Sequence, residues 1–145
     1  MVEGLGDWDD VEDDVDASEP ADSPHDAGEE PSLVFATVDQ FVQEHLAHTY
    51  RRTLNVQGGH TWCPEWWRHG EAISRLEALW RAWEDLRRDG QTGMSSWWRD
   101  HADHHMPILL STDGPFKGCT PEKGHNPRLA PLPCKPPPEG LFVPQ

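Results

Sequence analysis

The 145-residue chain is long enough for one domain and carries a formal net charge of −14. Residues 1–32 hold 13 of its 26 acidic residues and no Lys or Arg. The other 13 acidic residues face 12 Lys and Arg in residues 33–145, so that part is nearly neutral. A nearly neutral fold gives no electrostatic case for nucleic-acid binding.

The three cysteines form no pairing pattern, and the N-terminus has no basic stretch followed by an apolar one, as a secretory signal would. No apolar run approaches the roughly 20 residues of a membrane helix. We therefore expect a cytoplasmic protein with reduced thiols and no membrane contact.

The acidic head, residues 1–32, has few large apolar side chains and is predicted to be disordered. Trp8, among the acidic residues, suggests a short partner-binding motif, whereas a plain solvated tail is the alternative. At the other end, residues 126–145 are rich in proline and predict an extended, flexible tail. Pro133 and Pro136 fit a PxxP docking pattern, which is also common in tails that bind nothing.

Three helices are predicted between these ends. Thr37 and Gln40 form a capping box that opens the first helix, which is expected to run to about Arg52 or Thr53. Its apolar face comprises Val38, Phe41, Val42, Leu46, Tyr50 and Leu54. A loop over residues 55–60 follows, and residues 62–67 are read as a tight turn or one helical turn with Pro64 in it.

The central helix is expected from Gly70 to Asp89, because its apolar residues recur at helical spacing. These are Ala72, Ile73, Leu76, Leu79, Trp80, Trp83 and Leu86. The opposite face is predicted to carry the ion pairs Glu71–Arg75, Glu77–Arg81 and Glu84–Arg88.

Ser95 is expected to cap a third helix over residues 96–106, which Pro107 would end. Residues 108–110 read as a helical turn or a strand, and Phe116 as a return to the core. The fold class is thus mainly α: a small three-helix domain over residues 33–125 with long Trp-rich loops. It lies between the disordered acidic head and the Pro-rich tail.

Two Cys-x5-His pairs suggest a metal site. Cys63 precedes His69, and Cys119 precedes His125, by the same spacing. Two Cys and two His are a common ligand set for tetrahedral zinc, and a domain this small gains from such a staple. The alternative is that the cysteines are small buried apolar residues and the histidines cap helices or lie on the surface.

His101 and His105 lie four residues apart on the predicted third helix and are possible additional metal ligands. With Asp103 they suggest a three-ligand hydrolytic metal site that keeps a position open for water. The alternative is a polar helix face whose histidines pack on Trp97 and Trp98.

The sequence Trp-Trp-Arg occurs twice, at residues 66–68 and 97–99. Tryptophans beside arginine can stack single-stranded bases, which makes a nucleic-acid accessory protein one alternative. Tryptophans in small helical domains more often pack in the core, with the indole N–H donating to a carbonyl.

The stretch WCPEWWRHGEAISRLEALWRAWEDLR, then GMSSWWRDHADHH, then GPFKGC and a final GH, resembles an actinobacterial domain family of unknown function. The resemblance covers about residues 41–125 and leaves the head and the tail outside. Two positions depart from the pattern, since Gly70 and His104 stand where members often have proline. The matching residues are Trp62, Cys63, Pro64, Trp66, Trp67, His69, Glu71, Ala72, Leu76, Trp80, Trp83, Trp97, Trp98, Arg99, Asp100, His101, Asp103, His105, Gly114, Pro115, Phe116, Cys119 and His125.

The resemblance implies a bacterial setting on plasmids, integrated elements or phages, and it supplies no activity. From the residues we expect a non-enzymatic helical binding or adaptor module that is stabilised by zinc and has a protein partner. A metal-dependent hydrolase and a nucleic-acid-binding accessory protein are the alternatives.

Overall fold

The computed structural model describes residues 32–54 and 57–145 of the chain. These residues form three helical segments and no strand, which confirms the predicted mainly α fold. Residues 33–145 make up one compact unit. No helix of the described part has both the length and the apolar character that crossing a membrane requires. The predictions for residues 1–31 fall outside the described residues.

The first helical segment runs through α1 (Val38–Phe41), the π-helical η1 (Val42–Leu46) and α2 (Ala47–Thr49). It begins as predicted, because the Thr37 hydroxyl accepts a hydrogen bond from the Gln40 backbone N–H at 3.4 Å. It ends three residues before the predicted Arg52. Most of its predicted apolar face is buried, and Val38 and Leu54 pack against the core at its margin.

The central helix is α3 (Gly70–Leu86), which follows the short 3₁₀ helix η2 (Trp66–Arg68). It starts at the predicted residue and ends three residues before the predicted Asp89. Ala72, Leu76 and Leu79 are fully buried. Trp83 was predicted to be buried and is half-buried, because its ring lies against Phe35 and His45 at the edge of the core.

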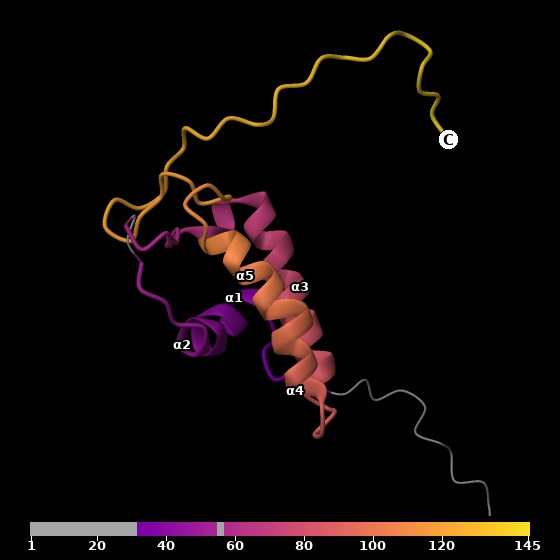
Figure 1. Ribbon diagram of the computed structural model, residues 1–145. Coiled ribbons are helices and arrows are strands. Elements are labelled where there is room, and N and C mark those ends of the chain that lie inside the picture. Colours follow the sequence, from indigo (N-terminus) through magenta and orange to yellow (C-terminus); the bar gives the residue numbers. More distant parts are fainter. Residues whose placement is uncertain (1–31, 55–56) are drawn as a thin grey trace, which may run out of the picture. The chain divides into compact units, whose positions relative to one another are not determined.

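The third helical segment consists of α4 (Gly93–Ser96), the π-helical η3 (Trp97–Ala102) and α5 (Asp103–Leu110). It lies beside α3 (Figure 1). Trp97, fully buried, donates its indole N–H to the Leu79 carbonyl at 3.0 Å and so fastens the two segments together. Trp97 therefore packs in the core with its indole N–H on a carbonyl, as one of the two interpretations of the Trp-Trp-Arg motif predicted.

Two boundaries of this segment were predicted wrongly. It begins at Gly93 rather than after Ser95, because the Asp89 carboxylate accepts from the backbone N–H groups of Gln91 and Thr92 and organises the turn earlier. It also continues through Pro107 to Leu110. A proline inside a helix costs about 3 kcal/mol. Burial of the Leu109 and Leu110 side chains offsets that cost, at about 1.5–3 kcal/mol each.

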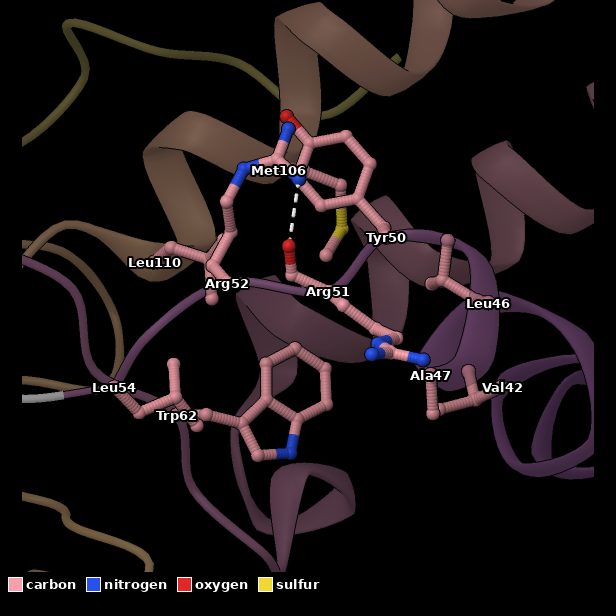
Figure 2. A pocket seen from close by; sticks show the side chains of 10 residues that line it. All are labelled: Val42, Leu46, Ala47, Tyr50, Arg51, Arg52, Leu54, Trp62, Met106 and Leu110. Atoms are coloured by element: carbon pink, nitrogen blue, oxygen red, sulfur yellow. Dashed lines mark hydrogen bonds between the residues drawn. The ribbon is translucent and has the colours of Figure 1, made fainter.

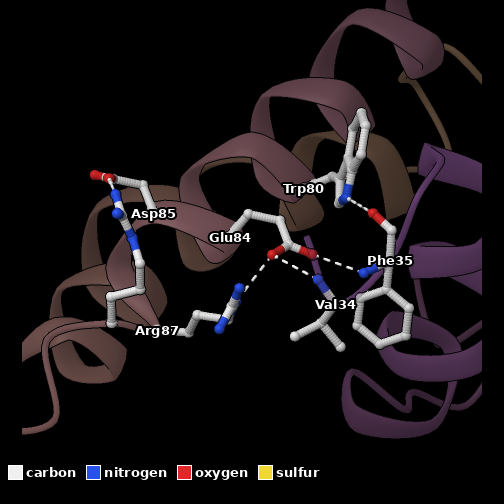
Figure 3. A network of polar contacts seen from close by, with 7 residues as sticks. Val34, Phe35, Trp80, Glu84, Asp85 and Arg87 are labelled. Carbon is white, nitrogen blue, oxygen red and sulfur yellow. Dashed lines mark hydrogen bonds and ion pairs between the residues drawn. The ribbon is translucent and has the colours of Figure 1, made fainter. Parts of the chain in front are cut away.

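A buried carboxylate fixes the entry into the first helix. Glu84 is only 5 % exposed, and its two oxygens accept from the backbone N–H groups of Val34 and Phe35 and from the Arg87 side chain at 2.8–3.1 Å (Figure 3). Nearby, Trp80 donates to the Phe35 carbonyl at 3.2 Å. The predicted Glu84–Arg88 pair is therefore wrong, since Arg88 pairs with Asp85 instead. The predicted Glu71–Arg75 pair is present at 2.9 Å.

Replacing Glu84 with glutamine is expected to destabilise the fold at pH 7 by about 1–3 kcal/mol, because an amide NH2 would face one of the N–H donors. Burial alone would raise the pKa of Glu84, but the hydrogen bonds from Phe35, Arg87 and Val34 outweigh it and lower that pKa. A lowered pKa means that the carboxylate stabilises the fold above its unfolded pKa, about 4.3, and ceases to do so as the pH falls through the folded value.

Urea unfolding of the wild type and the Glu84→Gln variant between pH 7 and pH 3 measures the contribution of the Glu84 carboxylate to the unfolding free energy. The gap in unfolding free energy should hold from pH 7 to about pH 5 and narrow below about pH 4. Glu77→Gln is the matched control on the same helix and should change little at any pH. A Glu84→Gln gap that persists unchanged at pH 3 would contradict the role of the charge.

A chain that starts at Leu33 is expected to melt within a few degrees of the full chain, because residues 1–32 lack core-forming side chains. It retains Val34 and Phe35, which bond to Glu84. Thermal unfolding followed by circular dichroism measures the difference, and a loss of the cooperative transition on removal of the head would refute the prediction.

Candidate metal centre

Cys63 is placed by a short extended segment that pairs with the end of α5. His60 forms an isolated antiparallel bridge with Ser111, and the Thr61 backbone N–H donates to the Leu110 carbonyl at 2.8 Å. The Thr61 hydroxyl, itself buried, donates to the carbonyl of Cys119. This hydrogen bond ties the segment that carries the first cysteine to the loop that carries the second.

His69 occupies the residue that precedes α3. Its backbone carbonyl accepts from Ile73 in the first turn of the helix, while its side chain makes no capping bond and is free to turn elsewhere. The Nε2 atom lies 3.6 Å from the sulfur of Cys119 and 3.0 Å from Nδ1 of His125. The ring also hydrogen-bonds the backbone of Pro115, which favours its protonated form. A backbone carbonyl on the second ring nitrogen is the usual support of a metal-binding histidine.

Cys119 and His125 flank a tight loop. Thr120 and Gly124 exchange backbone hydrogen bonds of 2.8 and 3.2 Å across it. Gly118 has a φ of +80°, and a Cβ there would meet the Asn126 side chain at 2.1 Å, so the loop requires glycine at this residue. The Asn126 backbone N–H donates to the sulfur of Cys119 at 3.2 Å and so helps to orient that sulfur.

The four side chains converge. One ligand atom from each of Cys63, His69, Cys119 and His125 lies within 4.8 Å of the others, so the group can hold a metal ion. The Cys63 sulfur is 3.6 Å from Nδ1 of His125, the same separation as in the other sulfur–nitrogen pair given above. Tetrahedral zinc, with bonds of about 2.3 Å to sulfur and 2.0–2.1 Å to nitrogen, places sulfur and nitrogen about 3.6 Å apart and two nitrogens about 3.3 Å apart. The observed sulfur–nitrogen separations of 3.6 Å match this geometry, and the observed nitrogen–nitrogen separation of 3.0 Å is slightly shorter.

The protonation of the site follows from its burial. Burial raises the pKa of the Cys63 thiol to about 11, with the neighbouring Cys119 adding to the effect. Burial and then the proximity of His125 lower the pKa of His69. Its imidazole is therefore neutral near pH 7, which is the form that binds a metal. A divalent cation would supply the positive charge that buried thiolates lack, and its binding would release protons.

The two histidines named as possible additional ligands lie outside this group. His105 faces Arg75, with its Nδ1 at 2.9 Å from the guanidinium, and burial followed by the Arg75 charge lowers its pKa. His101, half-buried in η3, belongs to no such group among the described residues. Asp103 is exposed and likewise belongs to none. Cys134 is exposed in the Pro-rich tail, as the sequence suggested.

Sequence reasoning missed the supporting residues of the site. Thr61 acts through its contact with Cys119, far along the chain, and no local pattern marks it. Pro115 belongs to the GPFKGC motif, but its contact with His69 could not be read from that motif. Asn126 had a weak signal, because it directly follows a candidate ligand and its N–H can turn back toward the preceding cysteine.

Comparison with known proteins identifies the family of the chain but assigns it no activity. No curated protein and no solved structure matches the chain. The model of a domain of unknown function, DUF4913, matches residues 35–138. The match includes residues 126–138, so the expectation that the whole Pro-rich tail lies outside the family region is wrong. Because this match covers more than half of the chain, the protein belongs to the DUF4913 domain family.

Proposed function

We propose that the protein is a non-enzymatic helical binding module in which Cys63, His69, Cys119 and His125 hold one structural zinc ion. The observation that carries this proposal is the convergence of the four ligand atoms within 4.8 Å, from segments about 50–60 residues apart in sequence. Two sulfurs and two imidazole nitrogens at these separations suit zinc better than the oxygen-preferring magnesium or calcium.

The number of ligands favours a structural role over hydrolysis. Four protein ligands fill a tetrahedral ion, whereas a catalytic zinc keeps one position open for water. Among the described residues, no second group of three or more His, Cys, Asp or Glu gathers around a common point. The three-ligand site considered for His101, Asp103 and His105 therefore has no support from the geometry.

The placement of the tryptophans favours a protein partner over nucleic acid. Of the four tryptophans in the two Trp-Trp-Arg motifs, only Trp67 is exposed, and Trp98 stacks on Tyr50. The two arginines pair with the acidic residues Glu65 and Asp100. The two motifs therefore do not present the row of exposed aromatic rings beside unpaired arginines that a protein needs to bind single-stranded nucleic acid.

The biological setting that we propose is the cytoplasm of a bacterium, on a mobile genetic element. The mobile-element part rests on the family resemblance, and the cytoplasmic part on the need of a zinc–thiolate site for reduced cysteines. A protein partner in that system is the role most consistent with a small module that has a closed metal site.

Metal analysis of the purified protein tests the proposal. We expect one zinc per chain, and substitution by cobalt(II) should give the strong visible absorption of a tetrahedral site with thiolate-to-metal charge transfer. Cys134→Ser is the matched control and should keep both signals, whereas Cys119→Ser should lose them. A protein that holds no zinc would refute the site, and a five-coordinate or water-bearing cobalt spectrum would favour the hydrolase alternative.

A further inference from the structure

A pocket of about 320 Å³ lies among the first helical segment, the extended residues that follow it and α5, which contributes Met106 and Leu110. Figure 2 shows Val42 and Leu46 on one side of the pocket, with Leu54 and Trp62 on the other. The volume is at the low end for ligand sites, which usually span about 300–1,000 Å³. It has room for a few apolar side chains and not for a folded surface.

The rim of the pocket is basic. Arg51 and Arg52 both line it and both are exposed. The Arg52 guanidinium lies 4.0 Å from the centre of the Tyr50 ring and donates to the Arg51 carbonyl. Neither arginine forms an ion pair with an acidic residue of the described chain. The pocket therefore suits an apolar segment with an acidic residue beside it.

The chain itself contains such a segment. Leu141, Phe142 and Val143 are consecutive large apolar residues that are 62, 77 and 79 % exposed. The Leu141 N–H donates to the Pro138 carbonyl at 3.3 Å, and Gly140 has a φ of +80°, which closes a β-turn just before the three apolar residues. Glu139 lies within this turn and is exposed, so its charge is available to the two arginines.

The spacer between the domain and this apolar segment decides whether the segment reaches the pocket of its own chain or that of a second copy of the protein. Residues 127–138 contain six prolines. Pro-rich chains extend by about 3.1 Å per residue and stay stiff over several residues, so 12 such residues hold the segment up to roughly 37 Å from His125. His125 lies against Cys63, next to the pocket residue Trp62. Figure 1 shows the tail leading away from the helices. A stiff Pro-rich spacer disfavours folding of the apolar segment back onto its own domain.

We propose that Leu141, Phe142 and Val143 of one chain bind in the Arg51–Arg52 pocket of a second copy, and that the protein self-associates through this exchange. The apolar side chains would enter between Leu46 and Trp62, and Glu139 would pair with the basic rim. This inference goes beyond the proposed function and does not require the metal.

The first test compares molar mass by light scattering after size exclusion, at physiological ionic strength so that the charge of the acidic head is screened. The full chain should rise from the monomer toward the dimer mass as its concentration increases. The chain ending at Pro138 and the Phe142→Ala variant should stay monomeric over the same range. Leu132→Ala is the matched control, because Leu132 is also an exposed apolar residue of the tail, at 88 %, and this variant should behave as the wild type.

The second test uses a fluorescent peptide of residues 136–145 and the chain that ends at Pro138. Anisotropy should show saturable binding, weakened at least tenfold by Arg51→Glu with Arg52→Glu, while Arg81→Glu on α3 should leave it unchanged. Both arginines are exposed, so these changes should not unfold the protein.

Three outcomes would overturn the proposal. A peptide that does not bind the shortened chain would exclude the tail as the occupant of the pocket. Peptide binding that the double arginine variant leaves intact would place the tail elsewhere. A full chain that remains monomeric while the peptide binds would show that the tail folds back on its own pocket.

Discussion

Removal of zinc from the purified protein should lower its thermal midpoint sharply and broaden or abolish the cooperative transition. The described core is small, and the loop over residues 113–126 is held by its turns, by Phe116, by the hydrogen bond from Thr61 to Cys119 and by the proposed ion. A metal whose free concentration is 1,000 times its dissociation constant stabilises a fold by about 4.1 kcal/mol, so at that zinc concentration chelation should remove about this amount. Thermal unfolding with and without a chelator, followed by re-addition of zinc, measures the loss.

Cys119→Ser should reproduce the effect of the chelator and should make a chelator ineffective. Hydrogen exchange should report the loss first in residues 113–126, because that loop carries two of the four ligands, and later in α3 and α5. Cys134→Ser leaves every ligand in place and should melt as the wild type. A Cys119→Ser protein that remains as stable as the wild type, with zinc retained, would show that the cluster is not a metal site.

The helices could be predicted where their buried apolar residues recur at helical spacing. Leu76 and Leu79 lie on one stripe of α3, and both are fully buried. The ends were less predictable, because distant or competing contacts decide them. Pro107 should have ended the third helix, but Leu109 and Leu110 find burial by continuing it. Ser95 is a good N-cap residue by type, yet the Asp89 carboxylate starts that turn earlier.

Glu84 shows why a charge pattern can mislead. Its spacing from Arg88 is that of a surface ion pair, and nothing in α3 itself marks it as buried. The reason for its burial lies about 50 residues earlier, in the backbone N–H groups of Val34 and Phe35 just before α1, which both donate to its carboxylate. A buried carboxylate that serves a remote backbone cannot be recognised from helical periodicity, because its partners are defined only once the chain has folded.

The candidate metal ligands could be found because the same spacing occurs twice with suitable atoms. That signal does not state which nitrogen of each imidazole faces inward, and the two differ: His69 presents Nε2, whereas His125 presents Nδ1. It also does not show that the loop of Cys119 is tied to the segment of Cys63 through Thr61. These details depend on the tertiary packing of η2, α5 and the loop over residues 113–126.

Leu79→Ala is expected to cost about 2–5 kcal/mol of unfolding free energy, as a buried leucine truncated to alanine does. Leu79 belongs to α3 and is fully buried in the core, which also contains Trp97 and Leu109 of the third helical segment. The hydrogen bond from Trp97 goes to the backbone carbonyl of Leu79, so the variant keeps this bond. The loss therefore reports the cavity and the lost packing alone, and chemical denaturation at constant zinc measures it.

Arg81→Ala, two residues further along α3, is the matched control. Arg81 is exposed, forms no ion pair with any described residue, and lies 5.6 Å from the centre of the Trp80 ring. An exposed contact of this kind contributes less than about 1 kcal/mol, so this variant should unfold close to the wild type. Equal losses for the two substitutions would contradict the assignment of the faces of α3. A cost for Leu79→Ala below about 1 kcal/mol would mean that the third helical segment does not pack on α3 at this residue.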